Sequence, residues 1–227
     1  QGTGKWLAAG KLAGELDEKP VFVYTGMGPQ WWAMGRELYQ HEDVYREAVE
    51  QCDVLFRRIA GWSILAEMLA DQSASKMSDT AISQPANFLI QVGLTALWRS
   101  RGIEPAAIVG HSVGEVSAAY IAGVLSLEEA VLVSYHRSRI QKKAAGLGKM
   151  LAVGLSLEQC VDVLAQTNGD VSIAAINSPS SITLAGDARS LEAIAAYLTK
   201  IGEFNRFLQV EMAYHSPFME PLKPEVR

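Results

Sequence analysis

The sequence lacks most of the features that mark specialised classes of protein. It has only two cysteines, Cys52 and Cys160, neither with metal-ligand spacing around it, so we expect reduced thiols, a cytoplasmic protein and no metal site. No apolar run approaches the roughly 18 residues that a membrane-spanning helix requires. The net charge of −5 offers no basic excess to nucleic acid or to an anionic membrane. We therefore expect neither of these as a partner.

What the sequence does have is the composition of an ordinary globular protein, with 49% hydrophobic and 20% charged residues. Its 227 residues suffice for one sizeable core with a smaller appended unit. The chain begins with Gln1 and shows no signal-peptide pattern, internal repeat or low-complexity segment. We expect it to be a piece of a longer polypeptide.

The first two thirds of the chain have the pattern of an α/β core. Residues 20–26 (PVFVYTG) and 106–110 (AAIVG) are short, continuously apolar runs, typical of buried strands in a parallel sheet. Helical spacing recurs between and after them, over residues 43–59, 82–100 and 126–144. Ser126 and Glu129 have the spacing of a capping box at the start of the last of these helices.

A second unit is predicted after this core. Over residues 149–210 the order of strand and helix patterns is βαββαβ, which is typical of ferredoxin-like units. We therefore expect a linker over 1–19, an α/β-hydrolase-like core formed by 20–148 and 211–227, and a ferredoxin-like subdomain inserted between them.

A G-x-S-x-G motif stands at the junction of the second strand and the helix that follows it. In Gly110-His-Ser-Val-Gly114 the glycines permit a tight turn that projects the hydroxyl of Ser112 at a helix N-terminus. The amide of Val113 would then point at a developing oxyanion, which the helix dipole also favours. The alternative is a glycine-rich turn with an idle serine.

A serine nucleophile needs a base, and the chain has four histidines. His41 adjoins two acidic residues at a helix start, and His136 lies in the middle of a helix. His111 is next to Ser112, where neighbouring side chains diverge. His215 follows the last strand of the small unit, where the chain should return to the core, and is the best candidate by elimination. The alternative for any single histidine is a surface or core residue without a catalytic role.

Arg137 is the second informative residue. On its predicted helix it shares a side with Ala130, Val133 and Ile140, and an unpaired guanidinium on an apolar face is costly. It either pairs with an internal Asp or Glu, or binds a carboxylate of the substrate in a bidentate manner. The pattern alone leaves both open.

At this point the sequence resembles a known family. GHSVGEVSAAYIAGVLSLEEAVLVSYHRSR is similar to the acyltransferase domains of modular (type I) polyketide synthases, which are related to malonyl-CoA:acyl-carrier-protein transacylases. FVYTGMGPQWWAMGRELY, SQPANFLIQVGLTALWRSRGIEPAAIVGHS, GKMLAVGL, INSPSSITLAG and VEMAYHSPFM occur in the same order as in that family. The resemblance covers about residues 20–221.

The resemblance implies a ping-pong reaction in polyketide biosynthesis. Ser112 would attack an acyl-CoA thioester, His215 would relay the proton, and the phosphopantetheine thiol of a carrier protein would collect the acyl group. The backbone amides of Val113 and Met27 would hold the oxyanion. Many relatives carry Gln where this chain has Met27, but an amide donor tolerates that change. The implied partners are an acyl carrier protein and a neighbouring ketosynthase domain, with no bound cofactor.

The resemblance also implies how substrate is bound. Arg137 matches the arginine that binds the free carboxylate of malonyl-type units, and Gln84 and Asn177 match positions near the acyl pocket. Extender choice follows the four residues that end in the catalytic histidine, which here are MAYH and include Met212 and Tyr214. Because an aromatic ring before the histidine resembles the malonyl form and crowds an α-methyl group, we expect malonyl, with methylmalonyl as the alternative.

One departure from the family concerns the C-terminus. Family domains continue beyond the histidine with a segment whose backbone carbonyl orients the imidazole, whereas this sequence stops at Arg227, so we expect that support to be missing here. Two other functions remain open. One is a serine thioesterase or other hydrolase, which Arg137 and the inserted unit argue against. The other is a retired, non-catalytic domain, which the intact Ser112 and His215 argue against.

Overall fold

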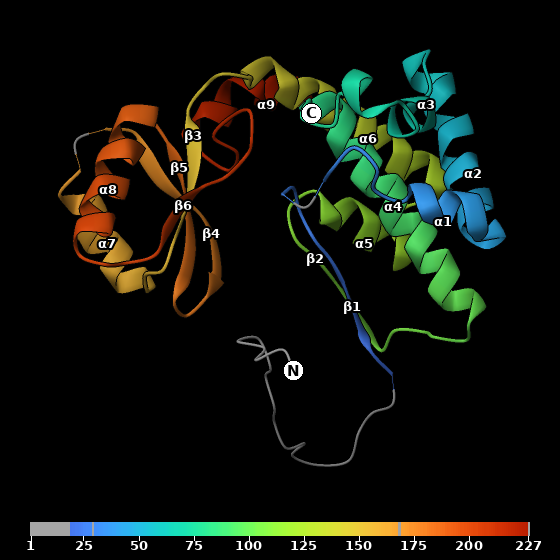
Figure 1. Ribbon diagram of the computed structural model, residues 1–227, viewed down its shortest axis with the longest axis horizontal. Helices are drawn as coiled ribbons and strands as arrows, with labels where there is room; N and C mark the ends of the chain where they lie inside the picture. The colour runs from blue at the N-terminus through green and yellow to red at the C-terminus, as the bar shows by residue number, and fades with distance from the viewer. Residues whose placement is uncertain (1–18, 29, 168, 227) are drawn as a thin grey trace.

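A computed structural model describes residues 19–28, 30–167 and 169–226. Apart from Lys19, the predicted linker over 1–19 lies outside these residues. The described chain forms two lobes, a helical lobe that carries a two-stranded parallel sheet and a smaller lobe built on a four-stranded antiparallel sheet (Figure 1). The predicted α/β fold class is therefore confirmed. The division of the chain into domains at the predicted boundaries stays a prediction.

The helical lobe contains strands β1 and β2 and six helices. Its elements are β1 (Val21–Tyr24), α1 (Arg36–His41), α2 (Asp43–Ala60), α3 (Ile64–Met68), the 3₁₀ turn η1 (Gln72–Ala74), α4 (Thr80–Ser100), β2 (Ala107–Gly110), α5 (Gly114–Ile121) and α6 (Leu127–Gln141). Helices α2, α4 and α6 pack against one another and enclose the largest apolar cluster of the described residues. In Figure 1 these helices lie on one side of β1 and β2.

The helices form where apolar spacing and capping agree. On α2 the buried residues Tyr45, Val49 and Phe56 recur at helical intervals and supply that cluster. At the start of α6 the predicted capping box is present, with reciprocal hydrogen bonds between Ser126 and Glu129. This fixes the first turn of α6, the helix that carries Arg137.

The sheet of the helical lobe is parallel, as predicted, but it is not buried. β1 and β2 pair in register from Val21 with Ala107 to Tyr24 with Gly110. Val21 is 53% exposed and Val23 is 62% exposed. The prediction of two buried strands is therefore wrong for the described residues. The physical reason is that the apolar runs specify strands, while helix α5 packs on the pair and no third described strand joins it.

The smaller lobe has ferredoxin-like connectivity, which confirms that prediction. Its elements are β3 (Lys149–Val153), α7 (Leu157–Ala165), β4 (Val171–Ser178), β5 (Ser181–Gly186), α8 (Ala188–Lys200) and β6 (Asn205–Phe207). The strand order is β4-β5-β3-β6, with every neighbouring pair antiparallel. Figure 1 shows α7 and α8 together beside this sheet.

The two faces of the small sheet bury different partners because side chains alternate along a strand. Leu151 on β3 faces the core under α7 and α8. Its neighbour Met150 belongs to a third apolar cluster, together with residues 212–214. This cluster also includes Ala144 of the 3₁₀ turn η2 (Lys142–Ala144), which directly follows α6. The returning segment is thus packed between the two lobes before the chain ends in η3 (Pro217–Leu222) and α9 (Lys223–Val226).

Candidate active site

Ser112 lies in a tight turn between β2 and α5. Its φ is 54°, in the left-handed region that costs a non-glycine residue about 1–3 kcal/mol. A Cβ on Gly114 would collide with the carbonyl oxygen of Tyr24, and one on Gly110 would meet Glu115 Cα. Only glycine therefore lets β1, β2 and α5 meet this closely. The elbow predicted from G-x-S-x-G is present, with the serine at its apex.

His215 faces this serine from 103 positions along the chain. Nε2 of His215 lies 2.8 Å from Oγ of Ser112. Like Ser112, His215 has a φ of 54°, and these two are the non-glycine residues with positive φ in the described chain. Partial burial first, and then the charges of Arg137 and His111, lower the pKa of His215. The imidazole is therefore neutral near pH 7 and free to accept a proton.

Arg137 enters the same group from α6. Nη2 lies 3.5 Å from Ser112 Oγ, and Nη1 donates to Oε1 of Gln84. Gln84 is 1% exposed, and its amide nitrogen donates in turn to Gln141 at 2.8 Å. Burial lowers the pKa of Arg137, and no ion pair joins it to a carboxylate among the described residues. A half-buried cation thus lies beside Ser112 without an ion pair to any described carboxylate, although the charge of Glu115 is near enough to favour it.

Two backbone amides are available near the serine. The amides of Met27 and Val113 donate no hydrogen bond to another described residue. The side chain of Met27 accepts one from Asn87 at 3.4 Å, so the side chain is held while its amide stays free. Donors of this kind can stabilise an oxyanion that develops on an attacked carbonyl.

The remaining predicted residues lie in different surroundings. Tyr214 is 5% exposed, and its hydroxyl shares a hydrogen bond with Thr80 Oγ1. Met212 is fully buried in the apolar cluster between the lobes. Asn177 is exposed on β4, where it donates to Thr183 at 3.0 Å. The structure therefore brings Gln84 and Tyr214 towards the serine group. The side chains of Met212 and Asn177 form no hydrogen bond with Ser112, His215 or Arg137, and their predicted roles stay predictions.

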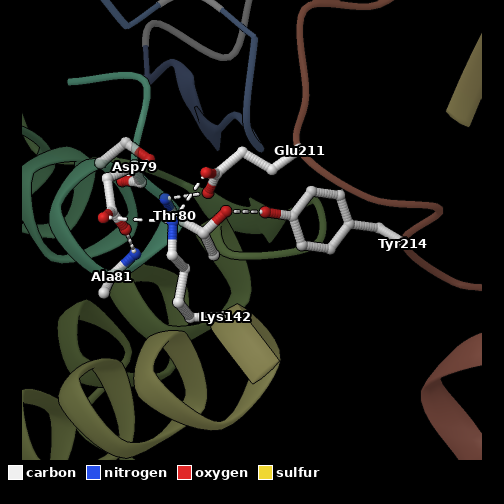
Figure 2. Close-up of polar contacts among 7 residues, drawn as sticks. Asp79, Thr80, Ala81, Lys142, Glu211 and Tyr214 are labelled. Carbon is white, nitrogen blue, oxygen red and sulfur yellow. Dashed lines mark hydrogen bonds and ion pairs between the residues drawn. The ribbon is translucent and has the colours of Figure 1, made fainter. Parts of the chain in front are cut away.

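Sequence reasoning missed several residues that hold this site together. Gln141 lies one helical turn after Arg137, a spacing that could have revealed it. Glu211, Thr80 and Lys142 form a polar network beside Tyr214, shown in Figure 2. Their contacts span 69 and 131 positions, and no local pattern signals them.

The described ranges also bear on metal binding and on membrane-spanning helices. They contain no group of three or more His, Cys, Asp or Glu residues that could hold a metal ion. None of their helices combines the length and the apolar character needed to cross a bilayer.

Comparison with known proteins is consistent with this geometry. Residues 21–227 match the Acyl transferase domain family. The highly reducing polyketide synthase poxF of Penicillium oxalicum is 42% identical over 211 residues, which are 90% of this chain and 8% of that protein. A loading acyltransferase from the avermectin modular polyketide synthase has a TM-score of 0.85 and 34% identity, covering 90% of this chain and 65% of the other. The malonyl-CoA:ACP transacylase of a Synechocystis species has a TM-score of 0.76 and 29% identity, covering 92% and 68%. This chain spans only 5% of the length of the hybrid PKS-NRPS synthetase pynA of Aspergillus niger and 10% of the length of highly-reducing polyketide synthase 1 of Aureobasidium melanogenum.

Proposed function

Because this chain belongs to the acyl transferase domain family and its relatives are polyketide synthases, we propose that it moves a malonyl unit from coenzyme A to a carrier protein. The acceptor is the phosphopantetheine thiol of an acyl carrier protein, and a ketosynthase domain of the same synthase is the neighbouring partner. The observation that carries the proposal is the 2.8 Å contact between Ser112 Oγ and His215 Nε2, beside Arg137, which forms no ion pair with a described carboxylate.

The first half-reaction loads the serine. Oγ of Ser112 attacks the thioester carbonyl while its proton passes to Nε2 of His215. The amides of Met27 and Val113 hold the resulting oxyanion. When the tetrahedral intermediate collapses, the C–S bond breaks, and the departing thiolate takes the proton from His215. The products are malonyl-Ser112 and coenzyme A.

The second half-reaction runs the same steps in reverse with a different thiol. His215 accepts the proton of the phosphopantetheine thiol, and its sulfur attacks the acyl-serine carbonyl. Collapse of this intermediate breaks the C–O bond, and the proton returns to Ser112 Oγ. The low pKa of His215 suits both halves, since the base must be neutral when each nucleophile arrives. The sequence of steps requires no metal and no bound prosthetic group.

Arg137 selects the acyl unit in this proposal. Its guanidinium, oriented by Gln84, binds the free carboxylate of malonate while the thioester carbonyl lies at Ser112. The ring of Tyr214 limits the space beside the α-carbon, which favours malonyl over methylmalonyl by about 1–3 kcal/mol.

The test is incubation with isotopically labelled malonyl-CoA, with and without a carrier protein. We expect label on the enzyme that persists without carrier and moves to the carrier thiol when it is added. Release of free malonate at a rate indifferent to carrier would instead identify a hydrolase. Competition between malonyl-, methylmalonyl- and acetyl-CoA, read as adduct mass on Ser112, tests the extender preference.

A further inference from the structure

The segment Glu211–His215 carries both the proposed base and the ring beside the acyl pocket, yet it is neither helix nor strand. The positive φ of His215 is unfavourable for a residue with a side chain and persists only where the surroundings hold it. The backbone supplies part of this hold. Gly146 N donates to the Glu211 carbonyl at 2.8 Å, and Ala213 N donates to the Leu147 carbonyl at 2.9 Å.

The side chain of Glu211 supplies a further part. Its carboxylate accepts a hydrogen bond of 2.7 Å from the backbone amide of Thr80, the first residue of α4. Its other oxygen pairs at 2.7 Å with Nζ of Lys142, which also lies 3.2 Å from the carboxylate of Asp79. Figure 2 shows these groups converging, with Glu211 and Tyr214 entering from the returning segment.

Glu211 is ionised in this position. Burial alone would raise its pKa, but the hydrogen bonds from Lys142 and Thr80 outweigh it and hold the pKa below the usual value for a glutamate. A carboxylate is also favoured at the N-terminus of a helix, where backbone amides lack partners. The contact therefore joins the charged side chain of Glu211 to the N-terminus of helix α4.

The start of α4 also holds the residues proposed to contact the acyl group. The hydroxyl of Thr80 is hydrogen-bonded to Tyr214, and Gln84, one helical turn further along α4, orients Arg137. Lys142 directly follows Gln141, which holds Gln84 from the other side. One helix start thus sets the position of the base segment, the pocket ring and the arginine relative to one another.

We propose that Glu211 is a positioning residue, which ties the Glu211–His215 segment to the start of α4 and to Lys142 so that His215 stays aligned with Ser112. This inference rests on the proposed function for the identity of the reaction, but not for the alignment itself. The pair is partly exposed, at 26% for the Glu211 side chain and 35% for Lys142, so it adds little to overall stability. Loss of the pair is therefore expected to disturb the geometry of the site while it changes the free energy of unfolding only a little.

The experiment compares Glu211→Ala and Glu211→Gln with the control Glu192→Ala in the full-length protein. Glu192 forms an ion pair of the same length, 2.7 Å to Lys149, on the surface of the smaller lobe. Two rates are measured, acylation of Ser112 by malonyl-CoA and labelling of Ser112 by a fluorophosphonate. In the labelling reaction a P–O bond to Ser112 forms, fluoride leaves and His215 accepts the proton, so this readout requires no acyl-CoA. Thermal unfolding is recorded in parallel.

We expect Glu211→Ala to slow both rates by roughly ten- to a hundredfold, because small misplacements of reacting groups have effects of this order. Glu211→Gln keeps an acceptor for Thr80 N but loses the charge, so its rates should fall between wild type and Glu211→Ala. The control should match wild type. Looser packing would return the pKa of His215, set by burial, Arg137, His111 and Glu115, towards its ordinary value. The acid limb of the pH profile should then move to higher pH in Glu211→Ala.

Wild-type rates in Glu211→Ala would overturn the inference. So would slower rates with an unchanged pH profile and a matching loss of folded protein, because that result describes a purely structural pair. If malonyl-CoA fails to load the wild type while fluorophosphonate labelling still depends on Glu211, the proposed function fails and the positioning role stands. If malonyl loading succeeds and neither rate depends on Glu211, the positioning role fails and the proposed function stands.

Discussion

Ser112 and His215 meet at 2.8 Å and share the same unusual backbone φ of 54°, but they are held there in different ways. Ser112 is supported by its own neighbours, since strand β2 ends two residues before it and helix α5 begins two residues after it. His215 stands in an irregular segment whose anchors, Thr80 and Lys142, are remote in sequence. The comparison teaches that the two members of a proposed reacting pair can be held equally close, one by local support and the other by distant support.

The largest effect is expected from removing the reactive atom of the elbow. Ser112→Ala should abolish acyl-enzyme formation, with a loss of about 10⁴-fold or more in rate, because no other group can form the ester. Intact-mass spectrometry after incubation with malonyl-CoA checks this. Ser117→Ala is the matched control, since its buried hydroxyl on α5 has no partner in the described chain and should keep the adduct. An adduct of normal mass on Ser112→Ala would place the nucleophile elsewhere.

Breaking the local support of the elbow should have the next largest effect. In Gly114→Ala the new methyl group meets the Tyr24 carbonyl, so β1 or α5 must shift. We expect a loss of about 1–3 kcal/mol in unfolding free energy and a roughly hundredfold slower acylation. Gly61→Ala separates the two effects. Because Gly61 has a φ of 78°, a side chain there is also unfavourable for the backbone, but a methyl group would meet no other atom. Gly61 also lies far along the sequence from the elbow. Chemical denaturation and single-turnover acylation are the measurements, and equal acylation in both variants would contradict the role given to the contact.

A smaller and more selective effect is expected from Arg137→Ala. Loss of one charged hydrogen-bonding group costs about 1.5–3 kcal/mol, or roughly ten- to a hundredfold in malonyl loading. Acetyl loading should persist because acetate carries no second carboxylate. Arg139→Ala, an exposed arginine on the same helix, is the control. Equal losses of malonyl and acetyl loading would show that Arg137 supports the structure instead.

The smallest effect is expected in the pH dependence of acylation and stability, which tests the surroundings of His215. Because burial and the charge of Arg137 lower the pKa of His215, the acid limb of acylation should lie below the ordinary histidine value of 6.5. The same shift makes the folded state less stable as pH falls from 6.5 towards the lowered value, since the unfolded chain takes up the proton first. Rate profiles and denaturation across this range test both signs. An acid limb above 6.5 would contradict the assignment.

The exposed sheet gives a further lesson about reading sequence. The apolar runs around Val21 and Val109 correctly predict parallel strands, because continuous β-branched residues favour extended backbone. The same runs wrongly predict burial. Burial depends on which other elements cover β1 and β2, and the residues inside a strand do not specify those elements. In the smaller lobe the order of the elements is predicted correctly, and α7 and α8 cover one face of the sheet. Burial is again uneven, since Ile176 on β4 is exposed.

Within the site the division follows the range of the interactions. The elbow at Ser112, the capping box of α6 and the ferredoxin-like order were predictable from the sequence alone, since each depends on residues a few positions apart or on the order of short patterns. The sequence also made His215 the best candidate for the proposed base and indicated that Arg137 needs a partner for its charge. Only the tertiary structure decided that His215 reaches Ser112, that Gln84 rather than a carboxylate holds Arg137, and that Glu211 anchors the base segment. The physical reason is that these contacts join groups between 53 and 131 positions apart. Their energies exist only after packing of the lobes has brought the groups within hydrogen-bonding distance.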